Sequence, residues 1–411
     1  MQQPRDTIQP RRSPNKAQVQ TNNERRDKKE KHRREVQIQK ENGNSRAQSP
    51  TTQQPLVAAE SSAAGAVREA ASTPHQTFLL PETVVYKYQA QPLPKWYLAL
   101  NIKKNAEMKR IAKNRPQALS ALDALKKCIG RCEQAQRNNP AQIHNLYEEL
   151  RDYVHKAEIK LHVTGPIVRT AMILHPTGLP CIFAEESAFP SDLKSDSYQL
   201  YCRWLREDFD QNILRGIVQV KSKERNADRL DQAYKKKFPT TAKYYGGEGL
   251  VLGQWWPTQL CTVRDGAHGA AQGGISGETD KGAYSIVLSG GGYHDQDDGD
   301  VIEYSGTDGK DFKATDATLH MVKSAELGNQ IRVIRSSQLV KKNKYRPEVG
   351  LRYDGLYVIK SFKVTDREKQ TYRFHLERCP GQDPIRCEDN SSRRPTPYEE
   401  EEFRNLKLKD W

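Results

Sequence analysis

An acidic, glycine-rich stretch stands out in an otherwise basic chain. Residues 283–306 read AYSIVLSGGGYHDQDDGDVIEYSG, with three consecutive glycines (290–292) followed by Tyr293, and with four aspartates between Tyr293 and Tyr304. Glycine lets a flat ligand or another backbone approach the main chain, tyrosine rings offer faces for stacking, and ionised aspartates accept hydrogen bonds. Together these residue types suit a flat, polar ring that carries a hydrogen-bond donor.

A cytosine turned out of a duplex is a ring of this kind. A flipped base needs stacking partners and a partner for its Watson–Crick edge, and the amino group of cytosine is a donor that a carboxylate accepts. Extrusion costs a few kcal/mol and aromatic stacking returns roughly 1–3 kcal/mol per base, so basic side chains must also hold the phosphates. The candidate phosphate contacts are Lys341, Lys342, Lys344 and Arg346 in KKNKYRP, and Arg332 and Arg335 in IRVIR.

The four acids have two alternative interpretations. The twelve-residue calcium loop needs glycine at position 6 and glutamate at position 12. Counted from Asp295, these positions hold Asp300 and Gly306, so the spacing argues against calcium. Solvated turn acids with no function are the second alternative.

No metal, cofactor or catalytic group is expected elsewhere. The seven cysteines are scattered, which suits free thiols in a reducing compartment. Cys128 and Cys132 lie four residues apart, but no second pair completes a zinc site. A nuclease or hydrolase that uses the acidic loop was considered, but no nucleophile–base pair or metal triad accompanies the acids.

Composition favours a polyanionic partner. The 411 residues include 66 Lys and Arg against 52 Asp and Glu, a net charge of +14, and such a balance is typical of nucleic-acid binding. Hydrophobic residues make up 36%, too few to form a packed core everywhere. No apolar run approaches the roughly 20 residues that span a bilayer, so no membrane partner is expected.

The chain divides into four predicted parts. Residues 1–88 read as a disordered basic tail, and their segment ERRDKKEKHRRE (24–35) is a candidate nuclear import signal. Residues 89–238 are predicted to be helical, residues 239–392 to form a sheet-rich domain, and residues 393–411 to be a tail or a capping helix. The predicted fold class is α+β, with a curved, barrel-like sheet and packed helices.

Periodicity supports these assignments. Apolar residues recur at three- and four-residue steps on one helical face: Ile143, Leu146, Tyr147, Leu150, Val154, Ala157 and Leu161. Residues 118–135, SDSYQLYCRWLREDF with a Ser/Asp cap, and KERNADRLDQAYKKKF are predicted to be further helices. The predicted strands are GLVLGQWWPTQLCTV, AYSIVLSG, DVIEYSG, NQIRVIRSSQL, LYVIKSFKV and QTYRFHLER, separated by glycine-rich turns and loops.

The segments GLVLGQWW, KGAYSIVLSGG, IRVIRSS, KYRPEVGLRYDGLYVI and YRFHLER together resemble the SRA domain, also called the YDG domain after its Tyr-Asp-Gly signature. That signature is Tyr353-Asp354-Gly355 here, where it reads as a turn between strands. The resemblance covers about residues 240–380, and the chain resembles a stand-alone SRA-YDG protein of fungal type. It implies a curved sheet and binding of 5-methylcytosine in double-stranded DNA, with the methylated base flipped into a pocket.

The resemblance also implies a set of site residues. Tyr304 matches a stacking tyrosine, Asp295 matches the aspartate that reads the cytosine edge, and Tyr293 stands one place after the position of the second ring. The Gly273-Gly274 turn matches the end of a loop that approaches the minor groove, with Gln272 near its tip. The main chain and hydroxyl positions of the pocket fall on Ser289, Gly290, Gly291 and Ser305.

The leading hypothesis is therefore a nuclear, non-enzymatic reader of methylated cytosine, with chromatin proteins as candidate further partners. The alternative is a chromatin-associated scaffold in which the SRA fold has lost base reading and the helical region binds a protein. The loop TDGKDFKATDATLH is short and lacks the basic finger of animal members, so hemimethylated preference, sequence context, the role of the helices and the oligomeric state stay open.

Overall fold

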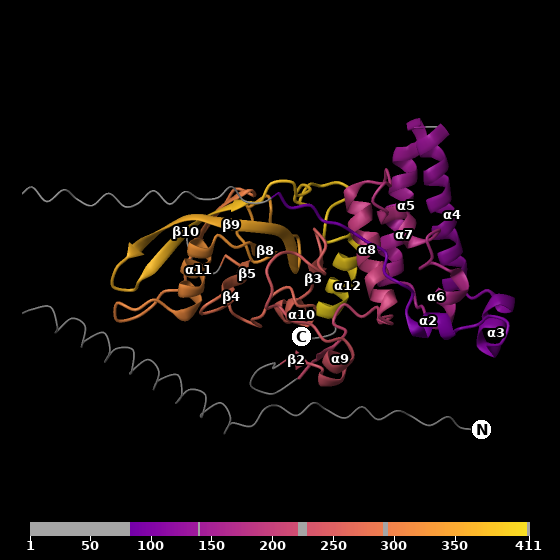
Figure 1. The fold of residues 1–411 in the computed structure, drawn as a ribbon, viewed down its shortest axis with the longest axis horizontal. Coiled ribbons are helices and arrows are strands. Elements are labelled where there is room, and N and C mark those ends of the chain that lie inside the picture. Colours follow the sequence, from indigo (N-terminus) through magenta and orange to yellow (C-terminus); the bar gives the residue numbers. More distant parts are fainter. Residues whose placement is uncertain (1–82, 139, 221–227, 291–294, 409–411) are drawn as a thin grey trace, which may run out of the picture. The chain divides into compact units, whose positions relative to one another are not determined.

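The computed structural model describes residues 83–138, 140–220, 228–290 and 295–408 (Figure 1). The first half of this part is helical. Its elements are α2 (Lys95–Ala99), α3 (Ala106–Asn114), α4 (Gln117–Asn138), η1 (Pro140–Gln142), α5 (Ile143–Ile159), α6 (Gly165–Ala171), α7 (Leu179–Phe183) and α8 (Ser191–Leu205). The import signal proposed at residues 24–35 and most of the predicted tail lie outside the described residues.

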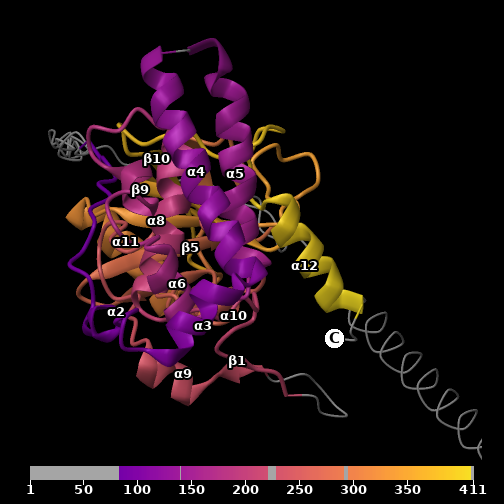
Figure 2. The ribbon, with the colours of Figure 1, turned by 90° about the vertical axis from the view of Figure 1, so that its right-hand side faces the viewer.

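The stripe predicted from the sequence does face a core. Leu150, Val154 and Ala157 of α5 are buried in one apolar cluster with residues of α4, α6, α7 and α8. Figure 2 shows α4 and α5 lying side by side as a helical hairpin. The helical region is thus held by an apolar interior of its own, as its 3.6-residue periodicity indicates.

Helix α8 begins earlier than the sequence suggested. It starts at Ser191, so the predicted cap at Ser195 and Asp196 falls in mid-helix, where both residues are buried. Asp196 has 0% exposure and binds His155 (2.7 Å), Arg386 (2.6 and 2.8 Å) and Arg394 (2.8 Å). This buried charge cluster (Asp196, His155, Arg386 and Arg394) joins α5 and α8 to the segment that follows the sheet.

A short connecting region leads into the sheet. It contains β1 (Ile217–Val218) and β2 (Arg229–Leu230), which pair antiparallel, and α9 (Gln232–Lys237). The prediction of a long polar helix over residues 223–238 is wrong in its extent. In the described part of this segment, Arg229–Leu230 form a strand and Gln232–Lys237 form a short helix. Residues 221–227 lie outside the described residues.

The sheet has eight strands. They are β3 (Trp255–Trp256), β4 (Ile275–Glu278), β5 (Gly282–Leu288), β6 (Gln296–Asp297), β7 (Val301–Ser305), β8 (Ile331–Ser336), β9 (Leu351–Asp366) and β10 (Thr371–Arg378). The pairing order is β4-β5-β8-β9-β10-β7-β6, with β3 added on β9. Among the strands of the described residues, only β5 and β8 pair in parallel, so the predicted α+β class is confirmed as a mixed sheet with helices.

The sheet is strongly curved. Ile275 of β4, at one end of the strand order, and Ile302 and Tyr304 of β7, near the other end, are buried in the same apolar cluster. Helix α11 (Asp316–Leu327) adds Met321 and Ala325 to this cluster. In the described residues β4 and β6 do not pair with each other, so the pairing pattern is that of a bent sheet with two ends.

Three predictions about this region are corrected. Tyr353-Asp354-Gly355 lies inside β9 and is not a turn. Residues 259–263, predicted as strand, belong to helix α10 (Gln259–Arg264), with the Thr258 hydroxyl accepting from Cys261 N. Helix α11 was missed, although Thr315 caps its start and Gly328 its end.

The two ends of the described part are packed against the rest. Residues 83–88 were assigned to the tail, but Tyr86 Oη lies 2.7 Å from Tyr353 Oη and Tyr88 Oη lies 2.9 Å from Ser195 Oγ. The predicted capping helix is α12 (Pro397–Leu408), whose Glu402 pairs with Lys160 at the end of α5. No helix in the described residues is both long and apolar enough to cross a bilayer.

Candidate nucleic-acid interface

The candidate pocket residues come from two strands and the loop between them. Ser289 and Gly290 follow β5, Asp295 directly precedes β6, and Tyr304 and Ser305 end β7. Gly291 and Tyr293 lie outside the described residues, so their assignment to the pocket stays a prediction.

Asp295 is held against the end of β7. Its Oδ1 accepts a hydrogen bond from Ser305 N at 2.8 Å. Burial raises the pKa of Asp295 above the usual range, outweighing the hydrogen bonds from Ser305 and the charge of Arg373. A carboxyl group of this kind accepts a hydrogen bond when ionised and also donates one when it holds a proton.

The side chain of Tyr304, at the end of β7, reaches the Gly273-Gly274 turn that precedes β4. Its side chain is buried, with 6% exposure, and its hydroxyl lies 3.3 Å from Gly274 O. A Cβ at Gly274 would lie 2.9 Å from that hydroxyl oxygen, so glycine permits this approach. The Gly273-Gly274 turn and strand β7, which carries Tyr304, are therefore neighbours.

Gly290 lies against the segment that follows β8. Its φ is +67°, and a Cβ there would lie 2.9 Å from Gln338 O and 3.0 Å from Leu339 Cα. A side chain would be both strained and obstructed at this position. The backbone after β5 is thus packed closely on residues 338–339.

The KKNKYRP segment docks on the acidic turn. Asn343 Nδ2 donates to Asp297 Oδ2 at 2.9 Å, and the ring of Tyr345 covers Gly299, where a Cβ would lie 2.3 Å from the ring. Because this segment touches the turn, its exposed lysines are fixed near the acidic loop. Those exposed residues are Lys341, Lys342 and Lys344.

Two further predicted contacts differ in accessibility. Gln272 is exposed at the tip of the loop before β4. Arg346 is only partly available, since its side chain is 18% exposed and donates to Ser337 O at 2.6 Å. The exposed lysines and Gln272 remain candidate DNA contacts, and Arg346 stays one with part of its guanidinium occupied.

The prediction that Arg332 and Arg335 contact phosphates is wrong. Both side chains have 0% exposure in β8. Arg332 donates to four backbone carbonyls, those of Ala242, Tyr244, Gly246 and Ala267. Arg335 binds Asp297, Asp354, Tyr357 and Gly299 O. Their guanidinium groups hold the domain together and are not available to a phosphate.

The four aspartates of the loop have different surroundings. Asp297 pairs with Arg335 at 2.7 Å; burial opposes its ionisation, but the bond and charge of Arg335 outweigh burial and lower the pKa of Asp297. Asp298 is exposed, and Asp300 lies 3.8 Å from Arg378. The sequence gives no local signal for this division, since Arg335 is 38 residues from Asp297.

Within the described residues, no group of three or more His, Cys, Asp or Glu side chains is arranged to hold a metal ion. Cys128 and Cys132 are buried in α4, where both thiols lie within 4 Å of Leu146 O. They behave as small core residues of the helical hairpin.

Fold and site together define an α+β domain that has a curved mixed sheet and a glycine- and acid-rich loop between two of its strands. Residues 244–382 match the model of the SAD/SRA domain, and this part of the chain belongs to that domain family.

Two known proteins are similar to part of this chain. A UHRF1-like protein of Cryptococcus neoformans var. grubii is 33% identical over 164 residues, covering 34% of this chain and 47% of that protein. The E3 ubiquitin-protein ligase ORTHRUS 2 of Arabidopsis thaliana is 32% identical over 176 residues, covering 36% of this chain and 26% of that protein. The chain thus spans less than half the length of either relative.

Among solved structures, the SUVH5 SRA complex with hemimethylated CG DNA is 31% identical, covers 35% of this chain and 99% of that chain, and has a TM-score of 0.29.

Proposed function

We propose that this protein binds double-stranded DNA that carries methylated cytosine, and that the modified base turns out of the duplex into a pocket bounded by Asp295, Tyr304 and the Gly290 main chain. The observation that carries the proposal is the half-buried Asp295 carboxyl, which Ser305 N holds in place and whose pKa burial raises. Membership of residues 244–382 in the SAD/SRA family supports it.

The chemistry of Asp295 suits the edge of a cytosine. Its oxygen accepts from the amino group of the base, and its protonated form can donate to the ring nitrogen beside that group. One such hydrogen bond adds about 1 kcal/mol, and more when charge is involved. Because extrusion costs a few kcal/mol, the exposed lysines at positions 341, 342 and 344 supply the remaining attraction through the phosphates.

The test is a comparison of affinities for matched duplexes. Fluorescence anisotropy should show tighter binding to a methylated duplex than to an unmethylated one. Asp295→Ala should reduce this preference about tenfold or more, because a bidentate edge contact is worth about 1–3 kcal/mol. Asp298→Ala is the matched control, since Asp298 is an exposed acid of the same loop, and it should keep the preference.

Base flipping has its own readout. A 2-aminopurine placed beside the methylated cytosine should become more fluorescent on binding of the wild-type protein and less so with Asp295→Ala. Equal affinity of the wild type for both duplexes at moderate salt would contradict methyl reading and favour the scaffold alternative.

We further place the protein in the nucleus and assign it no catalytic step. The basis for the location is its proposed DNA partner and the basic segment at residues 24–35. Deletion of this segment from a fluorescent fusion should reduce nuclear accumulation, and unchanged accumulation would contradict the assignment.

A further inference from the structure

Helix α9 carries three consecutive exposed lysines and precedes the residues that match the domain family. Lys235, Lys236 and Lys237 form its last turn. In the described part of the chain, no ion pair joins any of them to a carboxylate; Lys237 Nζ lies 4.9 Å from the centre of the Phe238 ring. Their charges are therefore available to a partner.

The helix is fixed in place by buried groups. Tyr234 donates its hydroxyl to Asp208 Oδ2 at 3.0 Å, and Asp208 pairs with Arg215 at 3.1 Å. The ring of Tyr234 lies against Gly216, where a Cβ would be 2.5 Å away. The lysines of α9 are thus presented on a rigid support.

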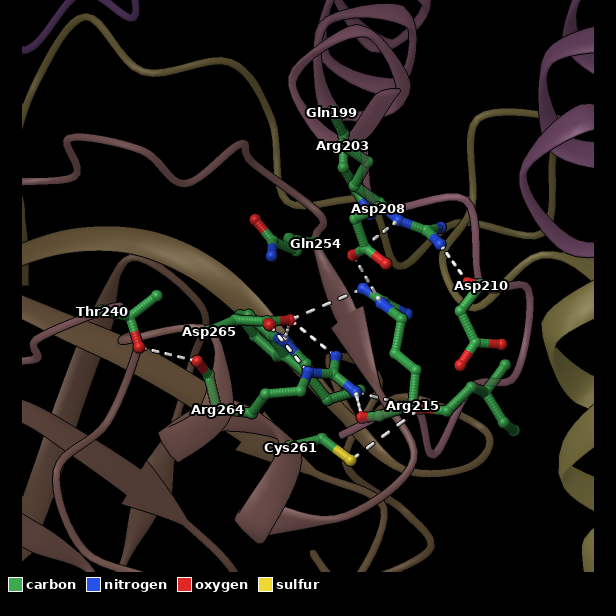
Figure 3. A network of polar contacts seen from close by, with 12 residues as sticks. Gln199, Arg203, Asp208, Asp210, Arg215, Thr240, Gln254, Cys261, Arg264 and Asp265 are labelled. Carbon is green, nitrogen blue, oxygen red and sulfur yellow. Dashed lines mark hydrogen bonds and ion pairs between the residues drawn. The ribbon is translucent and has the colours of Figure 1, made fainter. Parts of the chain in front are cut away.

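The support continues to α10, as Figure 3 shows. Arg264, the last residue of α10, binds Asp265 at 2.7 Å and donates to Arg215 O at 2.9 Å. Asp265 also lies 3.8 Å from the guanidinium of Arg215. This charge network (Asp208, Arg215, Arg264 and Asp265) connects α9 to the C-terminal end of α10.

The other end of α10 holds the loop before β4. Gln259, the first residue of α10, donates to Ala270 O (2.9 Å) and Gly273 O (2.7 Å). A cavity of about 260 Å³ is lined by Tyr234 and Lys235 of α9, by Gly269 of the loop and by Ser276 of β4.

The loop itself brings no positive charge. Residues 266–274 read GAHGAAQGG, and burial lowers the pKa of His268 to about 4, so the loop is neutral at physiological pH. A neutral loop gains little from the phosphates, whereas a lysine cluster beside it provides that attraction.

We propose that α9 is a second DNA-contacting element, in which Lys235, Lys236 and Lys237 bind backbone phosphates beside the site of the Gln272 loop. This proposal rests on the proposed function, because that function determines which side of the domain faces DNA. It assigns a role in DNA binding to residues that lie before the matched domain.

The experiment uses the full chain and two matched triple variants. K235Q/K236Q/K237Q removes three charges from α9; K109Q/R110Q/K113Q removes three exposed charges from α3 and is the control. Anisotropy on unmethylated and methylated duplexes is measured from 50 to 200 mM salt. Thermal unfolding should be unchanged in both variants, because these side chains are exposed.

The α9 variant should bind both duplexes about tenfold more weakly at 100 mM salt. The slope of log K against log salt should become shallower by roughly 2–3, at about 0.9 per phosphate contact, with the methylated-to-unmethylated ratio unchanged. The α3 variant should change affinity less than about twofold, the scale of a nonspecific charge effect.

Equal loss in the two variants, or wild-type binding by the α9 variant, would overturn the α9 proposal. Methyl reading is judged separately by the wild-type ratio of affinities. If that ratio is one, the proposed base reading fails while the unmethylated duplex still reports on α9.

Discussion

Asp295 and Asp297 are two residues apart in one loop, but their carboxyl groups lie in different surroundings. Asp297 is part of β6 and pairs with the buried guanidinium of Arg335. Asp295 precedes β6 and accepts from the main chain of Ser305. The pKa of Asp297 is lowered by Arg335 and Asn343 in spite of burial, whereas burial raises that of Asp295.

Within three residues, the loop thus holds a structural acid, Asp297, and the acid proposed for base recognition, Asp295. A carboxylate that neutralises a buried arginine is committed to the folded state, because removing it leaves an unpaired charge. A carboxyl group whose ionisation is opposed by burial is the kind that is found at functional sites. The contrast can be tested by changing each acid in turn.

The largest effect is expected for Asp297→Ala. Both side chains of the Asp297–Arg335 pair are at most 2% exposed, and breaking a buried pair of this kind costs about 3–5 kcal/mol. Urea unfolding should show this loss, and Asp298→Ala should stay within about 0.5 kcal/mol of the wild type. A small effect for Asp297→Ala would mean that the pair contributes little to the fold.

The pH dependence should distinguish Asp295→Asn from Asp297→Asn. The raised pKa of Asp295 means that its favourable contribution is complete below about pH 4, the unfolded value, and is lost as the pH rises through the folded value. Asp295→Asn should therefore gain stability relative to the wild type between pH 3 and pH 7.

Asp297 should behave in the opposite way. Its lowered pKa means that its contribution is present above about pH 4 and is lost as the pH falls through the folded value. The destabilisation by Asp297→Asn should thus be greatest near neutral pH and shrink toward pH 3. Denaturation midpoints across this range measure both trends, and parallel trends would contradict the contrast.

The smallest effect is expected for Tyr304→Phe. The change keeps the ring and removes the hydroxyl that approaches Gly274 O at 3.3 Å, which is worth about 1 kcal/mol or less. Stability should fall slightly and the preference for methylated DNA should remain. A tenfold loss of that preference would show that the hydroxyl takes part in base recognition.

The elements with strong periodicity could be predicted from the sequence. The apolar stripe of α5 and the strands β5, β7, β8 and β10 occur where their patterns indicate. Helix α11 was also detectable, because Thr315 and Gly328 are typical helix boundaries.

The roles of the buried arginines could not be predicted in the same way. All six residues of β8 are buried, and the partners of Arg332 are carbonyls some 65 to 90 positions earlier in the chain. Basic residues in a strand are more often exposed, and only the tertiary fold shows that these two face inward. Asp354 of the Tyr-Asp-Gly signature likewise acquires its meaning from Arg335, 19 residues away.

The cluster around Asp196 has a consequence for the limits of the folding unit. The family match begins at residue 244 and ends at residue 382, yet Asp196 precedes it and both Arg386 and Arg394 follow it. A fragment trimmed to the match would discard all three groups and uncover the surfaces that they seal. Because these contacts join α5 and α8 to the segment after β10, we expect a fragment that runs from α5 through α12 to be more stable than one trimmed to the match.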